Sequence, residues 1–225
     1  MKRENVRNAW IAVLCLGMVL APKLGLAQAI GVFQDHGDVG TVLHPGSAVV
    51  GSEPGNYLVT GSGENMWLAA DAFQFVWKKV TGDVALGANI SFVGQGKNEH
   101  RKAVLMIRQS LDADSVYADL ALHGSELTSL QYRDAKGAVT HEIQSNMSAP
   151  SRLRIEKRGE YVYMLVAGPG EELHMAGGST RVPLEGYGER SANGSMRQRL
   201  TCWTACSAPV CWRLREMSTR SWKRW

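Results

Sequence analysis

Aromatic and planar polar side chains are the residues of this chain that could recognise a sugar. A sugar site needs an aromatic ring against the C–H face of the ligand and planar hydrogen-bonding groups around its hydroxyls. The candidate ligand-binding residues are Trp67, Arg108, Gln109, Gln131, Tyr132 and Arg133. They form one site only if the fold brings them to one sheet face, and Trp67 is also suited to a core. Asp71 is expected to cap a turn or pair with a buried arginine rather than contact a ligand.

Paired carboxylates are the second kind of residue that could do chemistry. Glycoside hydrolysis needs two carboxylates about 5–5.5 Å apart for retention or about 6.5–9.5 Å apart for inversion. Residues i and i+2 share a strand face, so a Glu-x-Asp pattern would indicate such a pair. Asp112 and Asp114 stand in a polar turn, and Glu171 and Glu172 are adjacent and face opposite sides of any strand. The sequence therefore favours a noncatalytic protein over a glycosidase.

The segment Asp112-Ala113-Asp114-Ser115 is a weak candidate for a structural calcium site. Clustered carboxylate and carbonyl oxygens are the ligands that Ca²⁺ prefers. The segment is not an EF-hand, because Val116 and Tyr117 stand where a ligand and a glycine are required. A solvated turn is the alternative for Asp112 and Asp114, and no other cofactor is expected.

The elements that position these residues are predicted to be strands. From about residue 57 to residue 182, apolar residues recur at every second position, as in half-buried strands. The continuously apolar run 103–107 is typical of a strand covered on both faces. Gly-containing turns at 134–137 and 158–160 predict two hairpins, and residues 30–54 predict irregular structure with one edge strand. The pattern predicts an all-β sandwich or barrel.

The first 29 residues are predicted to be a signal peptide. Lys2, Arg3 and Arg7 precede an apolar run over residues 9–21, and Ala27-Gln28-Ala29 supplies the small residues of a cleavage site. The apolar run is shorter than the roughly 20 residues that span a bilayer. We therefore expect an exported, periplasmic or extracellular protein with no membrane span.

The last forty residues differ in character from the rest. Residues 30–185 hold 13 Lys/Arg and 18 Asp/Glu, a net charge of −5, whereas residues 186–225 hold 8 and 2, a net charge of +6. The acidic body excludes a nucleic-acid partner. Tryptophan, arginine and three cysteines (Cys202, Cys206 and Cys211) occur in the tail without a helix or strand period. The tail is predicted to lie outside the domain; translation in a shifted reading frame and a disulfide-bonded or membrane-binding appendage are the two explanations.

Several segments in a fixed order resemble a known family. These are Asp38-Val39-Gly40, TGSGENMWLAADAFQFVWKKVTGD (60–83), KAVLMIRQSLDADS (102–115), LQYRDAKG (130–137) and SRLRIEKRGEYVYM (151–164). Over residues 32–185 the chain resembles the laminin-G/concanavalin A-like sandwich domains related to the C-terminal domain of β-xylosidases. Bacterial domains of this kind occur as secreted proteins, or beside glycanases and Tol-like propellers.

The resemblance implies a two-sheet jelly-roll sandwich associated with carbohydrate. Family members continue after the segment equivalent to Val182-Pro183-Leu184 with one or two further strands, whereas this chain enters its tail. We therefore expect a sandwich that lacks its last strands and has an unpaired edge. The expected function is a noncatalytic module that binds carbohydrate or an envelope polymer on its concave sheet. The alternative is a structural or protein-interaction domain that partners a Tol-like periplasmic propeller.

Overall fold

The computed structural model describes residues 30–184, apart from residues 95 and 97, and the backbone of residues 199–207 and 210–220. The predicted signal peptide, residues 1–29, lies outside the described residues. The described elements are sixteen β-strands. Their bounds are β1 Asp35–Val39, β2 Ser47–Val50, β3 Tyr57–Gly61, β4 Met66–Trp67, β5 Ala70–Asp71, β6 Phe73–Val80, β7 Val84–Val93, β8 Lys102–Arg108, β9 Tyr117–His123, β10 Thr128–Arg133, β11 His141–Gln144, β12 Arg152–Arg158, β13 Tyr161–Ala167, β14 His174–Arg181, β15 Arg199–Ser207 and β16 Val210–Arg220.

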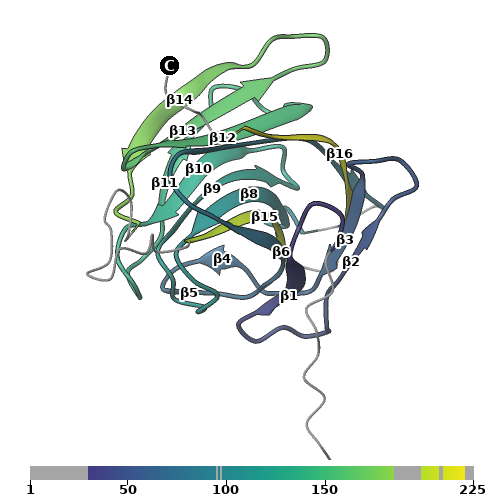
Figure 1. Ribbon diagram of the computed structural model, residues 1–225, viewed down its shortest axis with the longest axis horizontal. Coiled ribbons are helices and arrows are strands. Elements are labelled where there is room, and N and C mark those ends of the chain that lie inside the picture. The colour runs from purple at the N-terminus through teal and green to yellow at the C-terminus, as the bar shows by residue number, and fades with distance from the viewer. Residues whose placement is uncertain (1–29, 95, 97, 185–198, 208–209, 221–225) are drawn as a thin grey trace, which may run out of the picture.

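Two seven-stranded antiparallel sheets face each other. The inner sheet has the strand order β1-β6-β15-β8-β9-β10-β11, and the outer sheet has the order β14-β13-β12-β7-β16-β3-β2. The short hairpin β4–β5 lies on the side of the inner sheet that faces away from the outer sheet (Figure 1). The predicted all-β, two-sheet jelly-roll sandwich is confirmed. No helix among the described residues is long and apolar enough to cross a membrane.

The main core fills the space between the two sheets. Period-two alternation places Leu86 and Ile90 of β7 and Ile155 of β12 in this core, against Leu105 and Leu120 of the inner sheet. The predicted hairpins are also present, because β10 pairs with β11 and β12 pairs with β13. Residues 30–54 form two edge strands instead of the expected one, β1 on the inner sheet and β2 on the outer.

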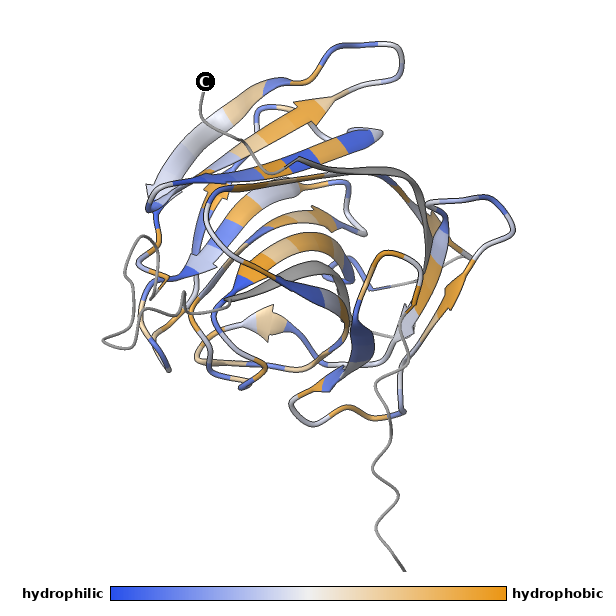
Figure 2. Ribbon diagram, in the orientation of Figure 1, coloured by the Kyte–Doolittle hydropathy of each residue, from blue (hydrophilic) through white to orange (hydrophobic). Residues whose placement is uncertain are grey.

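The inner sheet is covered on its other face as well. Val104 and Met106 of β8 join Phe73, Phe75 and Met66 in a second buried cluster on the hairpin side. Every residue of β8 is buried, as predicted from its continuous apolar run. The central strands of the sandwich are accordingly rich in apolar residues (Figure 2).

The expectation that residues 186–225 stand apart from the sandwich needs correcting for two segments. β15 lies between β6 and β8 in the inner sheet, and β16 lies between β7 and β3 in the outer sheet. The sheets therefore have closing strands, contrary to the expected loss of the last strands. Ladder hydrogen bonds use backbone groups, so strand pairing does not require a period in the side chains.

Candidate functional site

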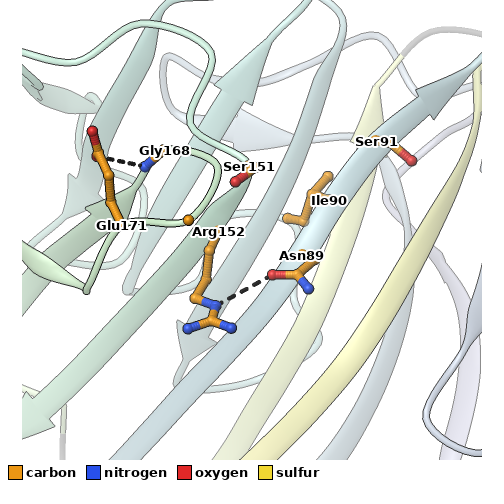
Figure 3. Close-up of a pocket in the computed structure, with 8 residues that line it drawn as sticks. Asn89, Ile90, Ser91, Ser151, Arg152, Gly168 and Glu171 are labelled. Atoms are coloured by element: carbon orange, nitrogen blue, oxygen red, sulfur yellow. Dashed lines mark hydrogen bonds between the residues drawn. The ribbon is translucent and has the colours of Figure 1, made fainter.

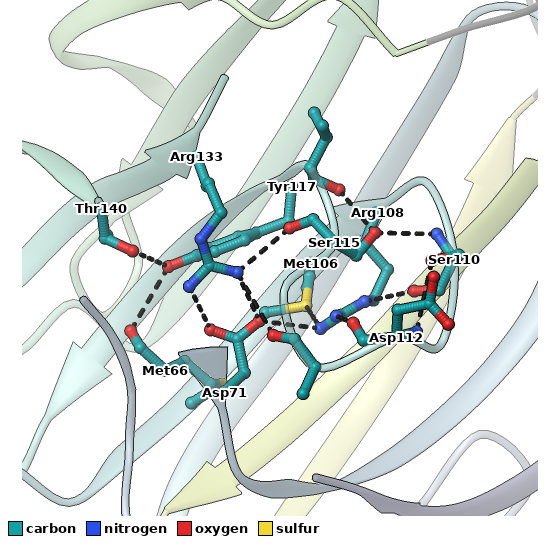
Figure 4. Close-up of polar contacts among 12 residues, drawn as sticks. Met66, Asp71, Met106, Arg108, Ser110, Asp112, Ser115, Tyr117, Arg133 and Thr140 are labelled. Atoms are coloured by element: carbon teal, nitrogen blue, oxygen red, sulfur yellow. Dashed lines mark hydrogen bonds and ion pairs between the residues drawn. The ribbon is translucent and has the colours of Figure 1, made fainter. Parts of the chain in front are cut away.

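Asp71 on the β4–β5 hairpin is locked to two arginines of the inner sheet (Figure 4). Its Oδ1 and Oδ2 accept hydrogen bonds from Arg133 Nη2 at 2.8 Å and Nη1 at 3.0 Å. Arg108 Nη1 lies 3.4 Å from Oδ2, and all three side chains are 0% exposed. Burial raises the pKa of Asp71, and the guanidinium groups of Arg133 and Arg108 oppose that rise. The expectation that Asp71 pairs with a buried arginine is confirmed.

The same two guanidinium groups fasten the neighbouring loops. Arg108 donates from Nε to the carbonyl oxygen of Ser110 at 2.6 Å. Arg133 donates to the carbonyl oxygens of Ala138 at 2.9 Å and Ser115 at 3.1 Å. Arg108 and Arg133 therefore act inside the protein, positioning the hairpin and two loops, instead of presenting donors to a ligand as the sequence suggested.

Leu68, in the turn between β4 and β5, has an unusual backbone conformation. Its φ is +56°, a region that costs a residue with a branched side chain about 1–2 kcal/mol. Its carbonyl oxygen accepts hydrogen bonds from Arg133 Nη2 at 3.0 Å and from Thr140 Oγ1 at 3.1 Å. These contacts hold the turn in place while the Leu68 side chain stays 65% exposed. A strained, exposed apolar residue maintained in this way indicates a functional surface.

Trp67, beside that turn, is half-buried and connects to a row of polar groups on the inner sheet. Lys102 Nζ lies 5.1 Å from the centre of the Trp67 ring and donates to Gln131 Oε1 at 2.8 Å. Gln131 Nε2 in turn donates to Glu142 Oε1 at 2.9 Å. Two of the predicted ligand-binding residues, Trp67 and Gln131, therefore lie on the same side of the inner sheet. Lys102 belongs to the same row of polar groups. Sequence reasoning missed it because it is the first residue of the apolar strand β8, a position where a lysine is expected to point into solvent.

A hollow of about 600 Å³ opens next to Trp67. We call it the hairpin hollow, and it is lined by Gly40, Thr41, Glu64, Asn65, Trp67, Leu68, Ala69, Ala70, Asp71, Ala72 and Ala113. Glu64 is exposed, and Asn65 is half-buried with its Oδ1 accepting the Met66 amide at 2.8 Å. The hollow thus combines one aromatic ring, small apolar side chains and a few polar groups, the composition expected of a small-ligand site.

The remaining predicted ligand residues lie elsewhere. Tyr132 neighbours Gln131 on β10 and so faces the opposite side, where it packs against the main core and stacks on His141 with ring centres 5.2 Å apart. Gln109 follows Arg108, and its half-buried side chain has an Oε1 without a hydrogen-bond partner among the described residues. Of the six predicted residues, Trp67 alone lines the hairpin hollow.

The predicted calcium ligands, Asp112 and Asp114, are bridged by a lysine. Lys136 Nζ lies 2.7 Å from Asp112 Oδ2 and 3.5 Å from Asp114 Oδ1, with all three side chains largely exposed. The hydrogen bond from Lys136 holds the pKa of Asp112 below its usual value. The ammonium group stands where a cation would be held, and the described residues contain no cluster of three metal-ligating side chains.

Two buried titratable residues of β9 were missed by sequence reasoning. Asp119 pairs in register with Gln131 and shares its face, and neither carboxyl oxygen has a hydrogen-bond partner among the described residues. Burial raises its pKa well above the usual value, while the charge of Lys102 opposes the rise. The period-two pattern of β9 could have placed Asp119 and His123 on the face opposite Leu120.

His123 is held in its neutral form by its surroundings. Its Nδ1 lies 3.0 Å from the carbonyl oxygen of Leu127, which can only accept, and its Nε2 lies 3.4 Å from the donor Nε2 of Gln131. The proton of the neutral ring therefore belongs on Nδ1. Burial and the nearby charge of Lys102 lower the pKa of His123 to about 4.

A second hollow of about 600 Å³ lies on the outer sheet (Figure 3). Arg152 Nε and Asn89 Oδ1 are 3.4 Å apart in it, and Glu171 Oε2 accepts the Gly168 amide at 2.9 Å. None of the described residues that line this hollow is aromatic. It lacks a platform for the C–H face of a sugar, so the hairpin hollow is the better candidate site.

No protein-family profile and no curated protein matches the sequence of this chain. Solved structures do match its fold. A functionally unknown protein from Saccharomyces cerevisiae matches with a TM-score of 0.56 and 11% identity, over 80% of this chain and 97% of that one. A mutant of the GH43 protein BlXynB from Bacillus licheniformis matches with a TM-score of 0.53 and 14% identity, over 76% of this chain and 34% of that one.

The carbohydrate-binding module CBM66 from Bacillus subtilis is also similar, with a TM-score of 0.47 and 12% identity, over 80% of this chain and 94% of that one. At 11–14% identity, the two matches with TM-scores above 0.5 show a shared fold alone. A family 7 alginate lyase, A1-II', is also among the similar structures. The relation to the β-xylosidase C-terminal domain stays a prediction.

Proposed function

We propose that this chain is an exported, noncatalytic carbohydrate-binding module whose glycan or envelope-polymer ligand lies in the hairpin hollow against Trp67. The observation that carries the proposal is a half-exposed tryptophan on the wall of a hollow, mounted on a hairpin that a buried ion pair holds in place. An aromatic ring of this kind packs against the apolar C–H face of a sugar.

The hairpin contacts supply a preorganised platform. Asp71 fastens one strand of the hairpin, the Leu68 carbonyl fastens its turn, and the Met66 carbonyl accepts from Lys102 Nζ and Tyr117 Oη, each at 3.3 Å. A site that is already ordered loses less conformational entropy when a ligand binds than a flexible one does. The hairpin therefore does not need to close over a polymer in order to bind it.

The carboxylates around the hollow support binding over glycoside hydrolysis. Glu64 and Asp71 are the acidic residues that line it, and Asp71 is committed to Arg133. Asp119, on the strand β9 next to the strand of Lys102, is fully buried. Hydrolysis requires two carboxylates that both reach the scissile bond, and of the two that line the hollow only Glu64 is exposed.

A protein-interaction domain is the second candidate, favoured by exposed apolar residues near the hairpin. Leu68 is 65% exposed and Val139 is 56% exposed, and Thr140 joins their segments through its hydrogen bond to the Leu68 carbonyl. Exposed apolar side chains that gather in one place mark partner-binding surfaces. The partner would be an envelope protein such as a Tol-like propeller.

The variant Trp67→Ala tests the choice between these candidates. We expect it to weaken binding to a soluble polysaccharide by about tenfold or more, because the platform is lost. Affinity electrophoresis through gels containing xylan, β-glucan or bacterial polysaccharide measures the effect. Tyr161→Ala is the matched control, since Tyr161 is 49% exposed on β13 and does not line the hollow.

Thermal melts accompany the binding measurement. A Trp67→Ala variant that folds and binds as well as the wild type would rule out the platform. If the wild type binds no glycan, and Trp67→Ala loses binding to a partner protein that the wild type binds, the interaction domain is favoured. Export is tested by the mass of the secreted protein, which should begin near Ile30; a retained N-terminal segment would contradict it.

A further inference from the structure

We infer that the hairpin hollow selects neutral glycans with neighbouring hydroxyl groups and rejects acidic polymers, an inference that rests on the proposed function. The charges that line the hollow carry this inference. Glu64 is the one charged lining side chain without an ion-pair partner among the described residues, because Asp71 is paired with both Arg133 and Arg108. No lysine or arginine is among the described lining residues.

Outside the buried cluster of Asp71, Arg108 and Arg133, the charged side chains beside the hollow are on balance acidic. Ala113, on its wall, is flanked by Asp112 and Asp114, and the single ammonium group of Lys136 serves both carboxylates. Lys102 is not among the described lining residues, and its buried ammonium donates to Gln131 and to the Met66 carbonyl. A uronate or phosphate polymer would bring a like charge into this field, and like-charge contact across an interface is strongly unfavourable.

The hydrogen-bonding groups of the hollow match a pair of sugar hydroxyls. An ionised Glu64 has two oxygens that only accept hydrogen bonds, so it requires donors such as hydroxyl groups. Asn65 uses its Oδ1 for the Met66 amide, which leaves the two N–H groups of Nδ2 to donate. Glu64 and Asn65 both line the hollow, which therefore offers acceptors and donors as well as the ring of Trp67.

The alanines complete the site by leaving room for the sugar ring. Ala69, Ala70, Ala72 and Ala113 add apolar, short walls to a hollow whose volume of about 600 Å³ lies within the usual range for ligand sites. A neutral sugar can then place its C–H face on Trp67 and direct two hydroxyls to Glu64. An anionic sugar would lose part of its hydration on entering the hollow. It would find no lysine or arginine among the described lining residues to compensate for that loss.

Binding of neutral and acidic polysaccharides to the full chain tests the inference. Arabinoxylan and mixed-linkage β-glucan serve as neutral probes, and polygalacturonate and alginate as acidic ones, in low and high salt. We expect the wild type to bind a neutral probe at least about tenfold more tightly than either acidic probe. Neutral binding should change little with salt, because no charge on the ligand is screened.

Two substitutions at one position sharpen the test. Glu64→Gln should weaken neutral binding about fivefold to tenfold, because one acceptor oxygen is lost. Glu64→Lys should weaken it further and raise binding to polygalacturonate. Glu53→Lys makes the same charge change on an exposed residue outside the hollow and should alter neither.

The outcomes separate this inference from the proposed function. Tighter binding to an acidic probe, or full neutral binding by Glu64→Gln, would overturn the neutral-glycan inference and leave carbohydrate binding intact. Binding to none of the probes would overturn both.

Discussion

The two faces of the inner sheet are built from different chemistry. The face toward the outer sheet carries Leu105, Ile107 and Leu120 in an apolar core. The face toward the hairpin carries an apolar cluster together with buried charges, including Asp71 and Lys102. The apolar core can adjust to small changes, because burial is non-directional. The charged face has defined partners and distances, and its ion pair holds the hairpin that carries Trp67.

The largest expected difference between the faces comes from Asp71→Ala. Removing the carboxylate leaves Arg108 and Arg133 buried without their ion-pair partner, which should lower the free energy of unfolding by about 3–5 kcal/mol. Leu105→Ala on the other face should cost about 2–5 kcal/mol through its cavity. Urea denaturation measures both changes.

Binding distinguishes these two variants more sharply than stability does. Asp71→Ala should lose glycan binding, since the hairpin loses its fastening, whereas folded Leu105→Ala protein should bind normally. Equal binding by both would show that the charged face does not position the site.

The pH dependence of stability is the next largest effect and belongs to the hairpin-side face. His123 has a pKa of about 4 in the folded protein against about 6.5 unfolded, so the unfolded chain binds more protons between these values. Stability is therefore fully present above about pH 6.5 and is lost as the pH falls to about 4, by roughly 3 kcal/mol. His123→Gln should remove this part of the acid sensitivity. The exposed His44→Gln is the control, and an unchanged difference curve for His123→Gln would contradict the assignment.

The smallest expected effect concerns the hairpin turn. Leu68→Asn should raise the free energy of unfolding by up to about 1 kcal/mol, because asparagine adopts a positive φ at lower cost. Leu111→Asn replaces an exposed leucine outside the positive-φ region and should change stability little. A destabilised Leu68→Asn protein would mean that the leucine side chain itself contributes to the hairpin-side packing.

Of the predicted ligand-binding residues Trp67 alone lines the hairpin hollow, and strand alternation could have excluded some of the others. Gln131 and Tyr132 are neighbours on β10, as Arg108 and Gln109 are neighbours along the chain, so neither pair could converge on one face. The sequence alone indicated that Asp71 either caps a turn or pairs with a buried arginine, and the structure shows the second. It did not indicate which arginine, because that depends on the distance between β5 and strands formed some 40–60 residues later.

Period two in the apolar residues, and the turns between the runs, were sufficient to predict an all-β sandwich or barrel and several of its hairpins, because each strand must bury one face. The choice of a two-sheet sandwich came from the family resemblance. The tertiary structure decided the hairpin hollow, the covered polar row of Lys102, Asp119 and Gln131, and the central places of β15 and β16. Those features depend on contacts between distant segments and on backbone pairing, and neither leaves a local pattern in the side chains.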